Sequence, residues 1–110
     1  SNTVTPATVP GAARIGTAIP GPLGGALTAA VSWLPPLNNG GSAITGYRVR
    51  ALRMSTRGAV LATTVSAVQP ATARSLSMTL PAGRYRFTVQ AINAIGDGPQ
   101  SARSNLTPAL

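Results

Sequence analysis

The side chains that could do chemistry are few in this sequence. Nine basic residues, all of them arginine, stand against one acidic residue, Asp97, and the 110-residue chain has no histidine, cysteine, lysine or glutamate. Catalysis needs a group that titrates near the working pH, an activated nucleophile or a bound metal. This composition excludes paired carboxylates, Ser-His and Cys-His arrangements, Schiff-base lysines and thiolate metal sites. We therefore predict that the chain is not an enzyme and that it binds no cofactor or metal.

The single carboxylate lies in a glycine-rich segment. Asp97 stands between Gly96 and Gly98, and an Asp in such a turn commonly hydrogen-bonds the nearby backbone. One carboxylate with backbone carbonyls does not make a convincing calcium cage. We expect Asp97 to stabilise its own turn.

The charge balance points to an anionic partner. The formal net charge is +8 at pH 7, and a strong excess of one sign attracts polyanions. The competing interpretation is that an arginine-rich, lysine-free composition reflects a GC-rich genome. Salt also screens exposed charges beyond ~8 Å under physiological conditions, which supports the interpretation that the excess charge has no partner. Both interpretations stay open.

Apolar and polar residues alternate along most of the chain, which is typical of β-strands, and no segment carries the apolar stripe of a helix. Segments rich in proline and glycine separate the alternating runs and predict turns. The expected strands cover residues 13–19, 26–34, 44–54, 59–68, 74–80, 84–94 and 100–106. The poorly phased fourth run predicts one short strand plus an irregular edge.

Alternation also predicts which side chains face the core, because successive residues of a strand point to opposite faces. The inward set is Leu27, Ala29, Val31, Trp33, Tyr47, Val49, Leu76, Met78, Leu80, Tyr85, Phe87, Val89 and Ala91. The outward set is Thr28, Ala30, Ser32, Arg48, Arg50, Arg84, Arg86, Thr88 and Gln90.

The length fits one domain with one core. A content of 44% hydrophobic residues is too high for a disordered chain, and 9% charged residues is low for a free-standing protein, so we expect neighbouring domains in the same polypeptide. No window reaches the ~18 apolar residues of a membrane span, which predicts no membrane insertion. Ser1-Asn2 looks like a cloning scar. We expect scar and linker over residues 1–9, the domain over 10–107 and a tail over 108–110.

Five pieces of sequence occur in a characteristic order between Pro10 and Leu106. They are Val31-Ser32-Trp33, Pro35-Pro36 with Asn39-Gly40-Gly41, Ile44-Thr45-Gly46-Tyr47, Leu80 with Gly83-Arg84-Tyr85, and Ala91-Ile92-Asn93-Ala94 with Gly96-Asp97-Gly98-Pro99. With these pieces the chain resembles the fibronectin type III domain family. The resemblance implies an all-β, immunoglobulin-like β-sandwich of about seven antiparallel strands, in one three-stranded and one four-stranded sheet.

The resemblance also implies roles for individual core residues. Trp33 and Tyr47 would stack in the core, and Leu80 and Tyr85 would form a tyrosine corner in which the Tyr85 hydroxyl bonds nearby backbone. The expected structural core is Trp33, Tyr47, Leu80, Tyr85, Phe87 and Val89. Two departures matter: Arg57-Gly58-Ala59 lacks the Arg-Gly-Asp sequence of some integrin-binding members, and acidic residues are almost absent. Integrin adhesion by that route is not expected.

In the family topology, the strands that carry the pairs Arg48, Arg50 and Arg84, Arg86 are neighbours. These four residues, the arginine face, would then lie together on one exposed surface with no acidic residue nearby. Like charges opposite each other across a sheet cost stability, and an anion would relieve the repulsion. The candidate polyanions are an acidic glycan (an anionic polysaccharide), a teichoic-acid-like polymer and nucleic acid. The chain lacks exposed aromatic residues for stacking bases, so nucleic acid is the unlikely one of these ligands.

Three functional hypotheses follow. The first is a non-catalytic structural spacer or a protein- or carbohydrate-interaction module of a larger, secreted or cell-surface bacterial protein, such as a polysaccharide-degrading enzyme; the family resemblance alone suggests this context and the extracellular location. The second is a polyanion-binding module that uses the arginine face. The third is protein recognition through the loops at 38–42 and 95–99.

Overall fold

The computed structural model describes residues 8–21 and 27–108. Four predicted features lie wholly or partly outside the described residues: the cloning scar, most of the linker, part of the turn near 20–25 and the end of the tail. The strands are β1 Arg14–Pro20, β2 Thr28–Leu34, β3 Ile44–Met54, β4 Val60–Val65, β5 Gln69–Pro70, β6 Ser75–Thr79, β7 Arg84–Asn93, β8 Asp97–Gln100 and β9 Thr107–Pro108. Nothing in the described ranges forms a helix that is long and apolar enough to cross a membrane.

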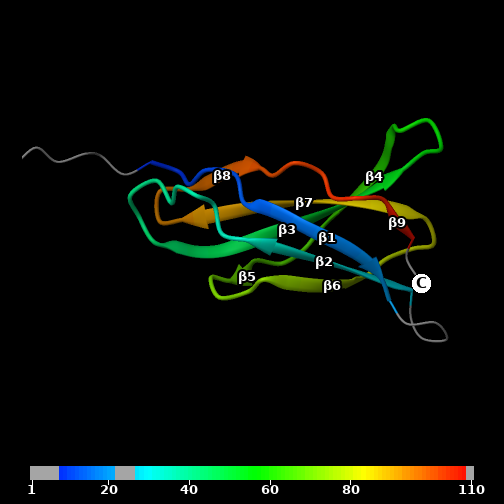
Figure 1. Cartoon of the computed structure of the whole chain (residues 1–110), viewed down its shortest axis with the longest axis horizontal. Coiled ribbons are helices and arrows are strands. Elements are labelled where there is room, and N and C mark those ends of the chain that lie inside the picture. Colours follow the sequence, from blue (N-terminus) through cyan, green and yellow to red (C-terminus); the bar gives the residue numbers. More distant parts are fainter. Residues whose placement is uncertain (1–7, 22–26, 109–110) are drawn as a thin grey trace, which may run out of the picture.

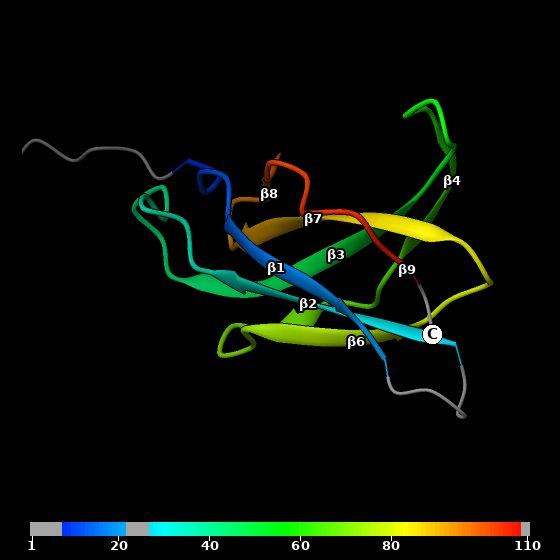
Figure 2. The same ribbon diagram turned by 45° about the vertical axis from the view of Figure 1, so that its right-hand side comes forward.

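The strands form two antiparallel sheets that face each other (Figure 1). One sheet has the order β1-β2-β6, and the other has the order β4-β3-β7-β8, with β5 beside β3 and β9 beside β7. Figure 2 shows the two layers from a second direction. Seven strands have four residues or more, so the all-β sandwich that the sequence predicts is confirmed. The larger sheet gains two additional strands of two residues each.

The core lies between the sheets and is built from the alternating rows. Side chains of β2, β3, β6 and β7 form one buried cluster together with Leu80, which follows β6. The cluster includes Trp33, Tyr47, Val49, Met78, Leu80, Tyr85, Phe87 and Val89. Rows of this kind are buried because each removes apolar surface from water against the opposite sheet.

Trp33 and Tyr47 meet across the sandwich. Their ring centroids are 5.7 Å apart and their planes are tilted by 53°, so the rings are in contact but are not stacked in parallel. Burial raises the pKa of the Tyr47 phenol, while the positive charge of Arg74 lowers it by a smaller amount. The Arg74 guanidinium lies 5.8 Å from the Tyr47 ring centroid, within the range of a cation-π contact.

Two side chains do not follow the predicted alternation. Leu27 was expected inside, but it precedes the first residue of β2 and is exposed. Thr88 was expected in water, but it is only 6% exposed, and its hydroxyl donates a hydrogen bond of 2.8 Å to Gln100 Oε1. Alternation assigns a residue to a face of the sheet and does not show whether a neighbouring segment covers that face.

The expected final strand over residues 100–106 is wrong. Gln100 is the last residue of β8, residues 101–106 form no strand, and β9 begins at Thr107. Between the two strands, serine hydroxyls complete the ladder with β7. Ser101 and Ser104 donate their N–H groups to Val89 O and Phe87 O, and their hydroxyls accept the N–H groups of the same two residues, all at 2.9 Å. Serine side chains that replace carbonyls in this way compete with a regular strand.

Tyr85 closes one end of the core. Its side chain is buried, and its hydroxyl donates a hydrogen bond of 2.7 Å to Pro81 O. Leu80, next to Pro81, is buried in the same cluster. The bond satisfies a polar atom that burial removes from water, which is the physical basis of a tyrosine corner.

Trp33→Ala is expected to lower the free energy of unfolding by about 3–5 kcal/mol, because it leaves a large cavity between the sheets. Leu34→Ala is the matched control, since the next side chain on β2 is exposed, and it should change stability by less than about 0.5 kcal/mol. Urea denaturation followed by circular dichroism measures both. Equal losses for the two variants would contradict the inward row.

Tyr85→Phe is expected to cost about 1–3 kcal/mol, because it leaves the Pro81 carbonyl without its partner. Tyr47→Phe is the control, since the Tyr47 hydroxyl has no hydrogen-bond partner among the described residues. At neutral pH that control should be close to wild type in thermal or urea unfolding. A Tyr85→Phe protein as stable as the control would show that the corner bond contributes nothing.

Candidate functional site

The arginine face lies on the outer side of the larger sheet, where β3 and β7 are direct neighbours. Arg48 is opposite Gln90, and Arg50 is opposite Thr88. On β7, Arg86 is opposite Leu52 and Arg84 is opposite Pro108. No arginine of this set is therefore directly opposite another, which removes the strongest form of the predicted repulsion.

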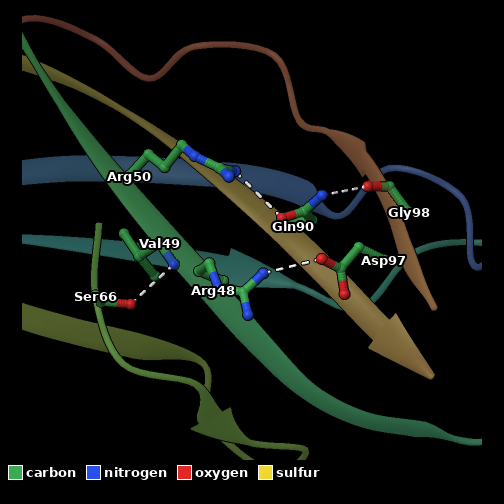
Figure 3. A network of polar contacts seen from close by, with 7 residues as sticks. All are labelled: Arg48, Val49, Arg50, Ser66, Gln90, Asp97 and Gly98. Atoms are coloured by element: carbon green, nitrogen blue, oxygen red, sulfur yellow. Dashed lines mark hydrogen bonds and ion pairs between the residues drawn. The ribbon is translucent and has the colours of Figure 1, made fainter. Parts of the chain in front are cut away.

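Arg48 has an acidic partner, contrary to the expectation that none is nearby. Its Nη1 donates a hydrogen bond of 2.9 Å to Asp97 Oδ2 (Figure 3). The two residues are 49 positions apart, and β8 brings Asp97 to Arg48 by running beside β7. The expectation that Asp97 bonds its own turn is also wrong, because its carboxylate reaches across the sheet. The side chains are 27% and 46% exposed, so solvent screens the pair.

The next arginine belongs to the same polar network. Arg50 Nη1 donates to Gln90 Oε1 at 3.1 Å, and Gln90 Nε2 donates to Gly98 O at 2.7 Å (Figure 3). Arg86 Nη1 donates to Ser104 O at 2.9 Å. Arg84 is exposed and makes no hydrogen bond or ion pair within the described part of the chain. Three of the four guanidinium groups thus have internal acceptors, with which an external anion would compete.

Asn93 is a second polar centre, and the sequence reasoning assigned it no role. It is buried at the end of β7, and its Oδ1 accepts the N–H groups of Ile95 and Gly96 at 2.9 and 3.1 Å. Its Nδ2 donates to Asn39 O at 2.9 Å and to Thr8 O at 2.8 Å. One side chain therefore joins the two candidate recognition loops to the segment that precedes β1.

A signal for Asn93 was present in the sequence. The inward row of β7 runs through Tyr85, Phe87, Val89 and Ala91, and the next inward position is an asparagine. A polar residue that continues an apolar row must find hydrogen-bond partners or destabilise the core.

The segment before β1 packs closely on both loops. Thr8 N donates to Gly40 O at 2.8 Å, and Gly11 N donates to Asn38 O at 2.9 Å. Gly40 has a φ of 78°, and a Cβ at this position would lie 2.2 Å from Thr8 O. Only glycine fits such a turn against such a close backbone.

Residues 8–21 and 27–108 hold no group of three or more His, Cys, Asp or Glu side chains that could bind a metal. A shallow hollow of about 250 Å³ lies on the outer side of β1 and β2, and no ionisable side chain lines it.

Two antiparallel sheets with this strand order define an immunoglobulin-like β-sandwich. A sequence model described as fibronectin type III domain matches residues 25–107. The chain belongs to the fibronectin type III domain family.

The curated proteins that this sequence matches come from animals. The proto-oncogene tyrosine-protein kinases ROS of Rattus norvegicus and Mus musculus are each 32% identical over 82 residues, which is 74% of this chain. The chain spans only 3% of the length of these curated relatives. These matches do not support the expectation of a bacterial source.

Solved structures show the same fold. The FN5 domain of Drosophila Lar matches with a TM-score of 0.64 and 26% identity, over 92% of this chain and 97% of that one. Domains A168-A170 of titin match with a TM-score of 0.73 and 22% identity, over 94% of this chain and 33% of that one.

A double-mutant cycle of Arg48→Gln and Asp97→Asn is expected to give a coupling free energy of about 0.2–1 kcal/mol, because the pair is partly exposed. The coupling should shrink in high salt. Urea unfolding at two salt concentrations measures it, and a cycle of Arg57→Gln with Asp97→Asn serves as the control for an arginine without this contact. No coupling at low salt would contradict the ion pair.

Proposed function

We propose that this domain is a non-catalytic spacer and interaction module that holds neighbouring domains of its polypeptide at a defined separation and orientation. The observation that carries the proposal is the attachment of residues 8–11 to both loops at one end of the sandwich. The family supports a module role, since fibronectin type III domains are generally non-catalytic.

The path of the chain suits a spacer. The described chain begins beside β8 and the two loops, and it ends at β9 at the opposite end of the sandwich (Figures 1 and 2). Domains joined to the two ends would therefore be separated by the length of the strands. A strand cannot shorten without breaking its ladder, so the separation would be stiff.

Residues 8–11, the entry segment, would add a defined orientation of the preceding domain. Three hydrogen bonds join Thr8 and Gly11 to Gly40, Asn38 and Asn93 at 2.8–2.9 Å. A flexible linker samples many directions, whereas a segment that is bonded to the body of the domain transmits its orientation to what precedes it.

The kinase contexts of the similar proteins agree with a multidomain setting. A structure of titin kinase and its flanking domains and a structure of the twitchin kinase region of C. elegans both contain a domain with this fold. A secreted or cell-surface location, a bacterial source and a polysaccharide-degrading parent extend the proposal on family resemblance alone. The flanking open reading frame tests them: a catalytic or glycan-binding neighbour supports this context, and an isolated intracellular gene removes it.

The alternative proposal is that the arginine face binds a polyanion such as an anionic polysaccharide. The internal acceptors of Arg48, Arg50 and Arg86 weigh against it. Retention on an immobilised polyanion at about 50 mM salt, with loss near about 200 mM, would support it. Absence of retention at the lower salt concentration would remove it.

Asn93→Ala is expected to free the entry segment and to cost about 1–3 kcal/mol, because the four backbone groups that Asn93 bonds lose their partner. A small reporter domain fused directly ahead of residue 8 should tumble with the wild-type domain and independently of the variant, as measured by time-resolved fluorescence anisotropy. Asn38→Ala is the control, since the Asn38 side chain bonds only the exposed turn at Gly40. Independent tumbling in the wild type would contradict the spacer proposal.

A further inference from the structure

The edges of the two sheets differ in how they are protected. At the outer edge of β1, the Asn105 side chain accepts the N–H of Ala18 at 2.8 Å and donates to its carbonyl at 2.9 Å. At β8, Gly98 lies so close to Pro10 that a Cβ would be 2.3 Å from the Pro10 carbonyl oxygen. Sheet edges are commonly blocked in these ways, because unpaired peptide groups otherwise recruit another strand.

The outer edge of β4 has no such protection. Its sequence, Val60-Leu61-Ala62-Thr63-Thr64-Val65, contains no charge and no proline, and all six residues are exposed. Leu61 is 59% exposed and Val65 is 49% exposed. An uncharged, β-branched edge strand is a template for another strand. Figures 1 and 2 show β4 projecting beyond the body of the sandwich.

The register shows which peptide groups face outward. Ser66 N donates to Val49 O at 2.8 Å, so the pair Ser66 and Val49 is hydrogen-bonded across the ladder. Bonded and non-bonded pairs alternate in an antiparallel ladder. Val65 and Thr63, which are opposite Arg50 and Leu52, therefore direct their N–H and C=O groups away from β3 and toward the open edge.

The charge around this edge favours an acidic occupant. Asp97 is the only carboxylate side chain of the sequence, and Arg48 already pairs with it. Arg57 lies in the turn that leads into β4, and Arg53 lies one strand inward, opposite Ala62. Both are exposed and make no ion pair within the described ranges. A net charge of +8 on each copy opposes pairing of β4 with a second copy of this chain.

We propose that the outer edge of β4 binds an extended, acidic peptide segment of a partner protein as an added antiparallel strand. Backbone hydrogen bonds to Thr63 and Val65 supply the pairing, and apolar side chains of the peptide pack beside Leu61 and Val65. The positive field of the domain selects acidic over basic peptides. This inference does not depend on the spacer proposal, because β4 is at the opposite end of the sheet order from β8 and the entry segment.

The test uses the full chain and a nine-residue probe peptide that alternates valine and glutamate. Nuclear magnetic resonance titration should show saturable shifts centred on β4, and hydrogen exchange should slow at the amides of Thr63 and Val65. A peptide in which lysine replaces glutamate should bind at least tenfold more weakly. Arg57→Gln should weaken binding of the acidic peptide about two- to fivefold, which is typical of an exposed charge pair.

The matched pair of variants is Thr63→Pro and Thr63→Ser. Proline removes an N–H that points away from β3, so it blocks the added strand while the ladder with β3 stays intact. Serine keeps the N–H, so binding should persist. If Thr63→Pro unfolds the domain, a probe peptide with alternate backbone nitrogens methylated makes the same test on the wild type, and it should not bind.

Four results would overturn the proposal. These are no binding of the acidic peptide to the folded domain, equal binding of the lysine peptide, protection at β6 or the arginine face in place of β4, and wild-type dimerisation through β4. Asn93→Ala leaves β4 untouched, so unchanged peptide binding in that variant separates this inference from the spacer proposal.

Discussion

The fold of this domain depends on the contact between the apolar faces of its two sheets. Neither face can stay in water, and each supplies one ring of the pair Trp33 and Tyr47, whose centroids lie 5.7 Å apart. Burial of these rows drives the fold in a chain that has no disulfide, no metal cluster among the described residues and one ion pair in the same ranges.

Polar contacts then define the ends and the outer face. Asn93 joins two loops to the segment before β1, and Tyr85 closes the core near Pro81. The Arg48–Asp97 pair and the Arg50–Gln90 contact spread the positive charge over internal acceptors. The surface is still strongly basic, but its most open feature is an apolar edge. The spacer proposal uses the two ends of the sandwich, and the peptide proposal uses its side.

Local alternation explains most of what the sequence predicted correctly. The rows through Trp33, Val49 and Phe87 were predictable because a strand points successive residues to opposite faces. Apart from Leu27, which lies just before β2, the errors fall where a residue of another segment decides the outcome. Gln100 covers Thr88, two serines replace a regular final strand, and β8 brings Asp97 to Arg48. The sequence predicted that β3 and β7, which carry the arginine face, are neighbours. It could not show that three of the four guanidinium groups have acceptors within the domain, because other segments of the fold supply those acceptors.

The most direct test of the account is a nuclear Overhauser experiment on the native domain. Protons of the Trp33 indole should show cross-peaks to the Tyr47 ring, because the two rings are in contact between the sheets. Such cross-peaks, together with strand-type shifts for β2 and β3, are the predicted result. Their absence in a folded sample, or a spectrum in which Trp33 behaves as a solvent-exposed side chain, would contradict the two-sheet core on which every other conclusion rests.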